Sequence, residues 1–239
     1  KGYDLAIRRM EHHLRHHFRK HGTDGYILLF DFSKFFDRVS HSVTKAIFRK
    51  EFTDPRIISL ADHFVDAFGE VGLGLGSQIS QVMALASANR LDHMCKEVLR
   101  IKGYGRYMDD GYLISESKEY LQECLAKIRT LCDELGITLN EKKTQIVKIS
   151  HGFTYLKARF FLLPSGKIVK KIYKRSVTKM RQKLKKFKGL QAAGKLKTED
   201  IDISVTCWVA YARKFNAWHT TENMIQLFYR LFPKEVLHV

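Results

Sequence analysis

Three aspartates stand where acidic side chains carry out metal-dependent chemistry. Asp31 follows an apolar run, and Asp109 and Asp110 separate two short strand-like segments. Mg²⁺ takes oxygen ligands and needs only a few carboxylates when substrate phosphates and water complete its coordination. Two such ions stabilise the attacking and leaving oxygens of an in-line phosphoryl transfer. The pattern predicts a phosphoryl-transfer site, with the alternative that these aspartates only shape turns.

The segments around the three acids predict the strands that position them. Residues 26–30 form a continuous apolar run, typical of a strand covered on both faces, and Asp31 lies at its exit. Residues 104–108 and 111–115 predict a tight hairpin that carries the other two acids at its tip. We also expect a strand over 144–149 and a hairpin formed by 153–163 and 166–172.

Apolar spacing predicts helices between and after these strands. The ranges are 3–20, 40–68 in two pieces broken near Pro55, 79–99, 120–135 and most of the chain beyond 170. Two helices are expected in this tail. The first has an apolar stripe of Val177, Met180, Leu184 and Phe187, and the second carries Trp208, Tyr211, Phe215 and Trp218 as core or, alternatively, as base-stacking residues.

Composition narrows the class of partner. The 239 residues are 45% hydrophobic, which excludes a disordered chain, and the net charge is +17. Residues 170–197 hold twelve Lys or Arg and no Asp or Glu, which indicates a nucleic acid partner more than a merely solvated surface. The run of His12, His13, His16, His17 and His21 predicts a partly protonated nucleic-acid-facing surface, with a metal site as the alternative.

Other classes are excluded by what the sequence lacks. No apolar run reaches the roughly 20 residues that span a bilayer, so no membrane is expected as a partner. Cys95, Cys124, Cys132 and Cys207 have neither zinc-ligand spacing nor the density of a disulfide scaffold. A reducing cytoplasm is the expected compartment.

Five short motifs follow one another along the chain. Residues 31–36 read Asp-Phe-Ser-Lys-Phe-Phe, residues 72–81 read Gly-Leu-Gly-Leu-Gly-Ser-Gln-Ile-Ser-Gln, and residues 107–110 read Tyr-Met-Asp-Asp. Residues 136–144 read Gly-Ile-Thr-Leu-Asn-Glu-Lys-Lys-Thr, and residues 152–156 read Gly-Phe-Thr-Tyr-Leu. In this order they resemble motifs A to E of the reverse transcriptases.

The resemblance implies an α+β right-hand polymerase. Its palm, an antiparallel sheet with helices packed on one face, would occupy residues 1–165 together with partial fingers, and a helical thumb would occupy 166–239. The implied enzyme is an RNA-directed DNA polymerase that adds deoxynucleotides to a DNA or RNA primer on an RNA template. Its cofactor would be two Mg²⁺ ions, for which Mn²⁺ can substitute.

The resemblance also implies roles for individual residues. Asp31, Asp109, Asp110 and the backbone carbonyl of Phe32 would hold the metal ions, and Lys143, or its neighbour Lys142, would donate a proton to pyrophosphate. Phe36 would exclude a 2′-hydroxyl, and the other nucleotide-binding positions are Phe35, Leu75, Gly76 and Gln81. The primer and template would contact Tyr107, Met108, Tyr155, Leu156, Lys179, Lys183 and Lys186. Without the resemblance, the alternative is that these aromatic residues belong to the core and that the lysines form a solvated surface.

The sequences of the motifs are most similar to those of bacterial enzymes of diversity-generating retroelements and group II introns. Many members have Gln where this chain has Leu75, which removes a polar contact to the nucleotide and predicts error-prone synthesis. An accessory protein or intron RNA is a further expected partner. The expected compartment is the bacterial cytoplasm, whether the protein is encoded by the bacterium or by a phage. Because Lys1 opens on what resembles the end of the fingers motif, we expect a fragment lacking most of the N-terminal fingers.

Three alternatives remain open from the sequence. They are a non-catalytic nucleic-acid-binding palm scaffold, a group II intron maturase-type reverse transcriptase, and an RNA-dependent RNA polymerase.

Overall fold

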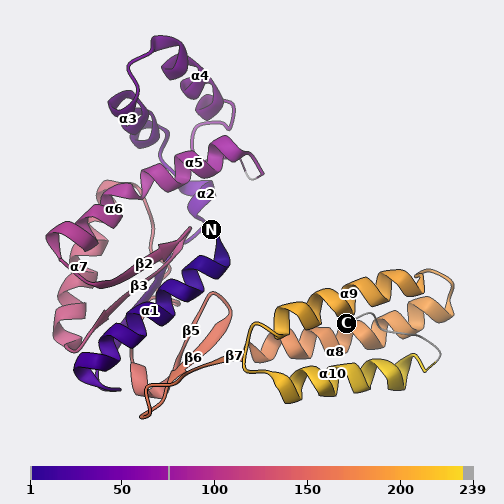
Figure 1. The fold of residues 1–239 in the computed structure, drawn as a ribbon. Helices are drawn as coiled ribbons and strands as arrows, with labels where there is room; N and C mark the ends of the chain where they lie inside the picture. The colour runs from indigo at the N-terminus through magenta and orange to yellow at the C-terminus, as the bar shows by residue number, and fades with distance from the viewer. Residues whose placement is uncertain (1, 75, 234–239) are drawn as a thin grey trace. The chain divides into compact units, whose positions relative to one another are not determined.

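The computed structural model describes residues 2–74 and 76–233. The chain divides into two compact units, Lys1–His151 and Gly152–Val239. Figure 1 shows that each unit has its own sheet and its own helices.

A four-stranded antiparallel sheet forms the centre of the first unit. The strand order is β2-β3-β1-β4, with β1 (Tyr26–Asp31) and β3 (Asp110–Ser115) inside and β2 (Gly103–Tyr107) and β4 (Gln145–Lys148) at the edges. The continuous apolar run of β1 is buried on both faces, as predicted. The predicted hairpin is also confirmed, because β2 pairs with β3 around residues 108–109.

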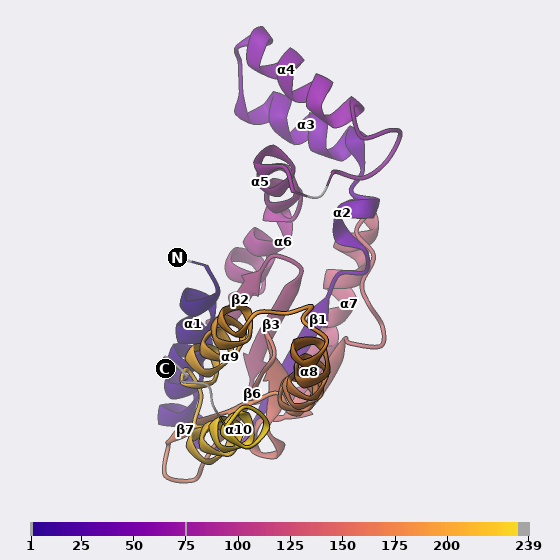
Figure 2. The same cartoon turned by 90° about the vertical axis from the view of Figure 1, so that its right-hand side faces the viewer.

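The two faces of this sheet are covered by different helices. Leu113 of β3 belongs to one core cluster with Leu28 of β1 and with Leu121 and Ile128 of α7 (Lys118–Glu134). The next side chain along β3, Tyr112, points to the other face. There it meets α1 (Tyr3–His21), which contacts β2 and β3. Figure 2 shows α1 and α7 on opposite sides of the sheet.

Between β1 and β2 the chain forms mostly helices (Figure 1). These begin with α2 (Phe35–Arg38), α3 (His41–Glu51) and α4 (Pro55–Asp66). The Asp54 carboxylate accepts a hydrogen bond from the backbone N–H of Arg56 at 2.9 Å, and Pro55 occupies the first helical position. Both features start a helix, because proline has no N–H to leave unpaired. The break predicted near Pro55 is therefore confirmed.

The prediction of a single helix over 79–99 is wrong in one respect, because the structure divides this segment into three helical parts. These are α5 (Gln78–Ser87), α6 (Asn89–His93) and a π-helical turn (Met94–Val98). The Ser87 hydroxyl donates to the Met83 carbonyl at 2.9 Å, a side-chain bond that bends helices. The composition of the segment alone shows no break.

Up to residue 233, the second unit contains a small sheet and three helices. The antiparallel strands are β5 (Phe153–Tyr155), β6 (Ala158–Leu162) and β7 (Ile168–Ile172), in this order. The helices are α8 (Lys174–Ala192), α9 (Thr198–Ala212) and α10 (Trp218–Leu231). Met180 and Leu184 of the predicted stripe are buried with Val205, Val209 and Phe228. Residue 165, the boundary expected from the sequence, lies in the loop between the paired strands β6 and β7.

Two predictions for this unit are wrong. The expected strand 153–163 turns back at Leu156 and Lys157, which both have positive φ angles, 47° and 63°. The expected helix through Trp218 ends at Ala212, because the backbone N–H of Asn216 donates to the Lys170 carbonyl of β7 and its side-chain oxygen accepts from the Lys170 N–H. Trp218 then begins α10 with 72% of its surface exposed, so it is not a core residue.

Within the described ranges, none of the helices combines the length and the apolar composition needed to cross a membrane.

Candidate active site

The sheet register brings the three predicted acids together. Asp31, the last residue of β1, pairs with Asp110, the first residue of β3, and Asp109 lies in the turn just before it. One carboxylate oxygen from each residue lies within 4.8 Å of the other two. Among the described residues, these acids form the single group of three or more His, Cys, Asp or Glu side chains with this metal-ligand spacing.

Crowding of negative charge distinguishes this site from an ordinary turn. Burial, followed by the charges of Asp109 and Asp31, raises the pKa of Asp110 to about 7. Burial, with Asp31 behind it, also raises the pKa of Asp109. Like charges directly opposite in a sheet destabilise it. A divalent cation would remove this repulsion, and carboxylate oxygens are the donors that Mg²⁺ takes, so the residues fit a magnesium site.

Two polar side chains from the loop after α7 reach the buried member of the cluster. Asp31 is 4% exposed, and its Oδ2 accepts hydrogen bonds from Lys143 Nζ at 2.9 Å and from Asn140 Nδ2 at 3.2 Å. The Asn140 N–H also donates to the Asp31 carbonyl at 2.7 Å. Sequence reasoning gave Asn140 no role, although it lies within the motif that contains Lys143.

The residues that follow Asp31 divide between the core and the surface of the site. Phe32 is 2% exposed, and its N–H donates to the Asp109 carbonyl at 3.2 Å. Phe35 is 6% exposed in the core, and the half-buried ring of Phe36 packs edge-on against it with centroids 5.9 Å apart. The buried Phe35 therefore supports the ring of Phe36 from the core side.

The glycine-rich loop lies beside these aromatic residues. The Leu73 N–H donates to the Phe36 carbonyl at 2.7 Å. A Cβ at Gly74 would lie 2.0 Å from the ring of Phe68, so a side chain there would displace that ring, whereas Gly76 has a φ of +93°, which favours glycine. Gln81 is exposed on α5. Leu75, expected at the nucleotide, lies outside the described residues.

The turn that carries Asp109 is held by a part-buried ion pair that sequence reasoning missed. Tyr107 and Met108 are partly buried, and Met108 has a φ of 55°. The Arg106 guanidinium donates to the Met108 carbonyl at 2.8 Å and to Asp92 of α6 at 2.6 Å. The position of Arg106 just before the Tyr-Met-Asp-Asp motif is the sequence feature that could have indicated this role.

The expected primer and template residues of the second unit surround the β5–β6 turn and α8. Tyr155 is 3% exposed, and Leu156 is the first residue of the turn. Lys179 and Lys183 line a hollow of about 520 Å³, whereas Lys186 is exposed on the same helix outside it. The remaining lining residues include two further basic side chains, Lys157 and Arg175, and the indole of Trp208. None of the residues that line it is acidic.

Three histidines of the α1 run, His13, His16 and His17, do not fit the partly protonated surface that the sequence predicts. Burial, with help from His12, Arg9 and His16, lowers the pKa of His13 to about 4. Burial also lowers the pKa of His16 and of His17. These side chains are therefore neutral at pH 7. His17 is buried and its Nε2 bonds the Asp24 carbonyl at 2.6 Å, so it is part of the packing.

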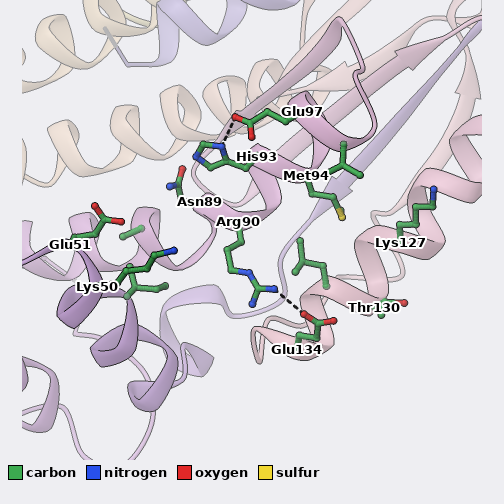
Figure 3. Close-up of a pocket in the computed structure, with 14 residues that line it drawn as sticks. Lys50, Glu51, Asn89, Arg90, His93, Met94, Glu97, Lys127, Thr130 and Glu134 are labelled. Atoms are coloured by element: carbon green, nitrogen blue, oxygen red, sulfur yellow. Dashed lines mark hydrogen bonds and ion pairs between the residues drawn. The ribbon is translucent and has the colours of Figure 1, made fainter.

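A larger hollow of the first unit lies apart from the acid cluster. It measures about 770 Å³ and is lined by α3, α6, the π-helical turn and α7 (Figure 3). Arg90 and Glu134 form an ion pair of 3.1 Å, and His93 and Glu97 form another of 2.6 Å. No residue predicted for catalysis or binding lines this hollow.

A sheet that brings together three acids from two adjacent strands and the turn before one of them, with helices α5 to α7 and a glycine-rich loop in the same unit, is typical of the palm of a template-dependent polymerase. A family model described as reverse transcriptase (RNA-dependent DNA polymerase) matches residues 4–160. The chain belongs to this family. Among curated proteins, none matches the sequence.

Solved structures show the same fold. Apo telomerase from Candida tropicalis, truncated from its C-terminal domain, has a TM-score of 0.56 at 15% identity and covers 71% of this chain. Telomerase from Candida albicans in complex with the TWJ fragment of telomeric RNA has a TM-score of 0.56 at 12% identity and covers 98%. The chain spans 40% and 52% of the lengths of these two proteins. At such identities the likeness shows the fold alone.

Proposed function

We propose that this protein is an RNA-directed DNA polymerase, which adds deoxynucleotides to the 3′ end of a primer on an RNA template. The proposal depends above all on one observation, the cluster of Asp31, Asp109 and Asp110 at the end of the palm sheet of a reverse transcriptase family member. These acids come from two strands and a turn, so their meeting requires the pairing of β1 with β3.

In this proposal Asp31 and Asp109 hold two Mg²⁺ ions, with Asp110 and the Phe32 carbonyl beside them. The ions, when bound, neutralise the charge that develops on the attacking and leaving oxygens. Mn²⁺ is a substitute with the same ligand preference. The raised pKa values of Asp109 and Asp110 support this assignment, because the Lys143 ammonium compensates only part of the negative charge of the three acids.

The chain's own residues perform the remaining steps. The Phe36 ring excludes the 2′-hydroxyl, held against Phe35, while Gly76 and Gln81 contact the incoming nucleotide. Lys143 hydrogen bonds Asp31 and donates a proton to the leaving pyrophosphate. Tyr107, Met108, Tyr155 and Leu156 contact the primer. Exposed lysines of α8 contact the phosphates of the RNA/DNA hybrid, a contact that depends on charge and helix shape rather than on sequence.

We further propose that the enzyme is a bacterial retroelement polymerase of the diversity-generating or group II intron kind, with a bound accessory protein or intron RNA. An aliphatic Leu75 in place of a glutamine supports low fidelity. Sequencing the complementary DNA made on a defined RNA template tests this point. The proposal predicts frequent misincorporation that falls when Leu75→Gln is introduced.

Primer extension tests the main proposal. The natural full-length protein is supplied with an RNA template, a DNA primer, Mg²⁺ and deoxynucleotides. We expect extension by the native protein, and a loss of about a thousandfold in Asp109→Asn, the scale of removing a charge-stabilising group. The exposed Asp37 provides the matched control, Asp37→Asn, which should extend normally.

Two other outcomes would each identify a different function. Tight hybrid binding without any nucleotide incorporation would indicate a non-catalytic scaffold. Preferential incorporation of ribonucleotides would indicate an RNA-dependent RNA polymerase.

A further inference from the structure

The strongest feature not used by the proposed reaction is the ion pair between α6 and β2, in which Arg106 is buried and the Asp92 side chain is 24% exposed. The Arg106 side chain is only 6% exposed. Its Nε donates to Asp92 Oδ1 at 2.9 Å and its Nη2 donates to Asp92 Oδ2 at 2.6 Å, a two-point contact that fixes the plane of the guanidinium. The Tyr104 hydroxyl donates to the same carboxylate.

The third contact of Arg106 reaches the turn that contains the acids. Its Nη1 donates to the Met108 carbonyl at 2.8 Å. Met108 has a φ of 55°, which side chains other than glycine rarely adopt, so the surrounding structure must hold this residue in place. The Arg106 bond is such a constraint, and it comes from a side chain that Asp92 itself immobilises.

The peptides on both sides of Asp109 are therefore hydrogen bonded. The Met108 carbonyl belongs to the peptide that enters Asp109, and it accepts from Arg106. The Asp109 carbonyl belongs to the peptide that leaves it, and it accepts from the Phe32 N–H at 3.2 Å. With both peptide planes held, the direction of the Asp109 Cα–Cβ bond is set before any ligand arrives.

We propose that Arg106, held by Asp92, is a positioning residue that fixes the Met108–Asp109 peptide and so orients the Asp109 carboxylate toward a divalent cation. Asp92 lies on α6, which follows the glycine-rich loop and α5 in the chain. The same contact thus ties the metal-binding turn to the helices that follow the nucleotide loop. This inference depends on the proposed function in one point, namely that a divalent cation binds at Asp109.

A purely structural role makes a different prediction. Removing one partner of a buried ion pair destabilises a protein whatever its function, because the other charge is left unpaired. Such an effect lowers the unfolding temperature but leaves the folded molecules with normal metal binding. The test must therefore measure metal binding and turn mobility in variants that remain folded.

The variants are chosen to separate charge from geometry. Arg106→Lys keeps the positive charge, but one ammonium cannot contact both Asp92 carboxylate oxygens and the Met108 carbonyl. Asp92→Asn keeps the shape of the side chain and removes its charge. The matched control is Arg90→Gln, a substitution on the same helix as Asp92 that breaks the exposed ion pair between Arg90 and Glu134 of α7 (Figure 3).

Binding of Mn²⁺ alone is followed by the paramagnetic resonance of the free ion, after thermal unfolding has shown that each variant is folded at the temperature used. We expect Arg106→Lys and Asp92→Asn to bind Mn²⁺ about tenfold more weakly or worse, the usual effect of losing a group that orients a ligand. Arg90→Gln should bind as the native protein does. Amide hydrogen exchange provides a second readout, and we expect the Phe32 N–H to exchange faster in both variants.

The outcomes distinguish this inference from the proposed function. Folded variants with native Mn²⁺ affinity and native protection of Phe32 would overturn the positioning role and leave the polymerase proposal intact. If the Asp109→Asn variant binds Mn²⁺ as tightly as the native protein does, the proposed metal site is overturned. In that case, faster exchange at Phe32 in the Arg106 and Asp92 variants alone would still support the positioning of the turn.

Discussion

The ammonium of Lys143 lies 2.9 Å from Oδ2 of Asp31, the most buried acid of the cluster. This hydrogen bond, together with the charges of the three acids, raises the pKa of Lys143. The lysine that the family resemblance assigns to the leaving group thus pairs with a proposed metal ligand. In this arrangement its positive charge compensates part of the charge that a divalent cation would otherwise neutralise.

Removing the Lys143 ammonium should therefore have opposite effects on binding and on catalysis. Because Lys143 is 63% exposed, its ion pair with Asp31 is worth little, and Lys143→Met should bind Mn²⁺ about two- to fivefold more tightly. Nucleotide incorporation should fall about a hundredfold if the side chain transfers a proton. Mn²⁺ titration and single-turnover kinetics measure the two effects, with Lys142→Met as the neighbouring control. Weaker Mn²⁺ binding in Lys143→Met would contradict this account.

The two phenylalanines after Asp31 should respond differently to truncation. Phe36→Ala should increase the use of ribonucleotides relative to deoxynucleotides by about tenfold or more, because in the proposed function the ring of Phe36 excludes the 2′-hydroxyl. Phe35→Ala should lower the unfolding temperature instead, because its side chain is buried in the core. Competition between the two nucleotide types in primer extension checks the first prediction. An unchanged sugar preference in Phe36→Ala would remove its assigned role.

Lysines on different sides of α8 should contribute unequally to hybrid binding. Lys179→Ala and Lys183→Ala should each weaken binding and reduce the slope of log affinity against log salt by about 1, as expected for a lost phosphate contact. Lys185→Ala should change both less, because Lys185 does not line the hollow around Trp208. Fluorescence anisotropy with an RNA/DNA hybrid over a salt series distinguishes the three variants. Equal effects at all three positions would indicate unspecific attraction.

His13 should make the stability of the first unit sensitive to acid. Its Nδ1 lies 2.9 Å from the Tyr112 hydroxyl, and burial lowers its pKa from 6.5 to about 4. Between these values the unfolded chain binds a proton that the folded chain does not, so stability falls as pH falls from 6.5 toward 4. His16 and His17 have lowered pKa values and act in the same direction.

Replacing His13 should therefore reduce this loss. Thermal unfolding of His13→Gln should show a smaller drop between pH 6.5 and pH 4.5, by roughly 2–4 °C. His219→Gln, an exposed substitution on α10, is the control and should follow the native curve. The assignment fails if the native and His13→Gln curves are parallel.

Much of the palm could be predicted because its signals are local. The unbroken apolar run before Asp31 can only be covered on both faces, and the two acids at 109–110 lie between segments that alternate like strands. The acid cluster then follows from pairing the two strands in antiparallel register. The family motifs supplied the roles, which spacing alone does not give.

The parts that were missed depend on contacts between distant residues. The turn at Leu156 and Lys157 contains no glycine or asparagine, so nothing in its composition indicates positive φ angles. The break after Ala212 is made by Asn216 bonding to the edge of β7. The anchoring of the Met108 turn requires Asp92, which lies fourteen residues before Arg106 on another element. Buried histidines likewise lose their charge through packing that a helical pattern does not show.

The central claim is that Asp31, Asp109 and Asp110 hold the metal ions of a polymerase. Anomalous diffraction from a crystal grown with Mn²⁺, an RNA template, a DNA primer and a non-hydrolysable deoxynucleotide tests it most directly. The account predicts two Mn²⁺ peaks in contact with the carboxylates of Asp31 and Asp109. A bound nucleotide and primer with no Mn²⁺ at these carboxylates would contradict it.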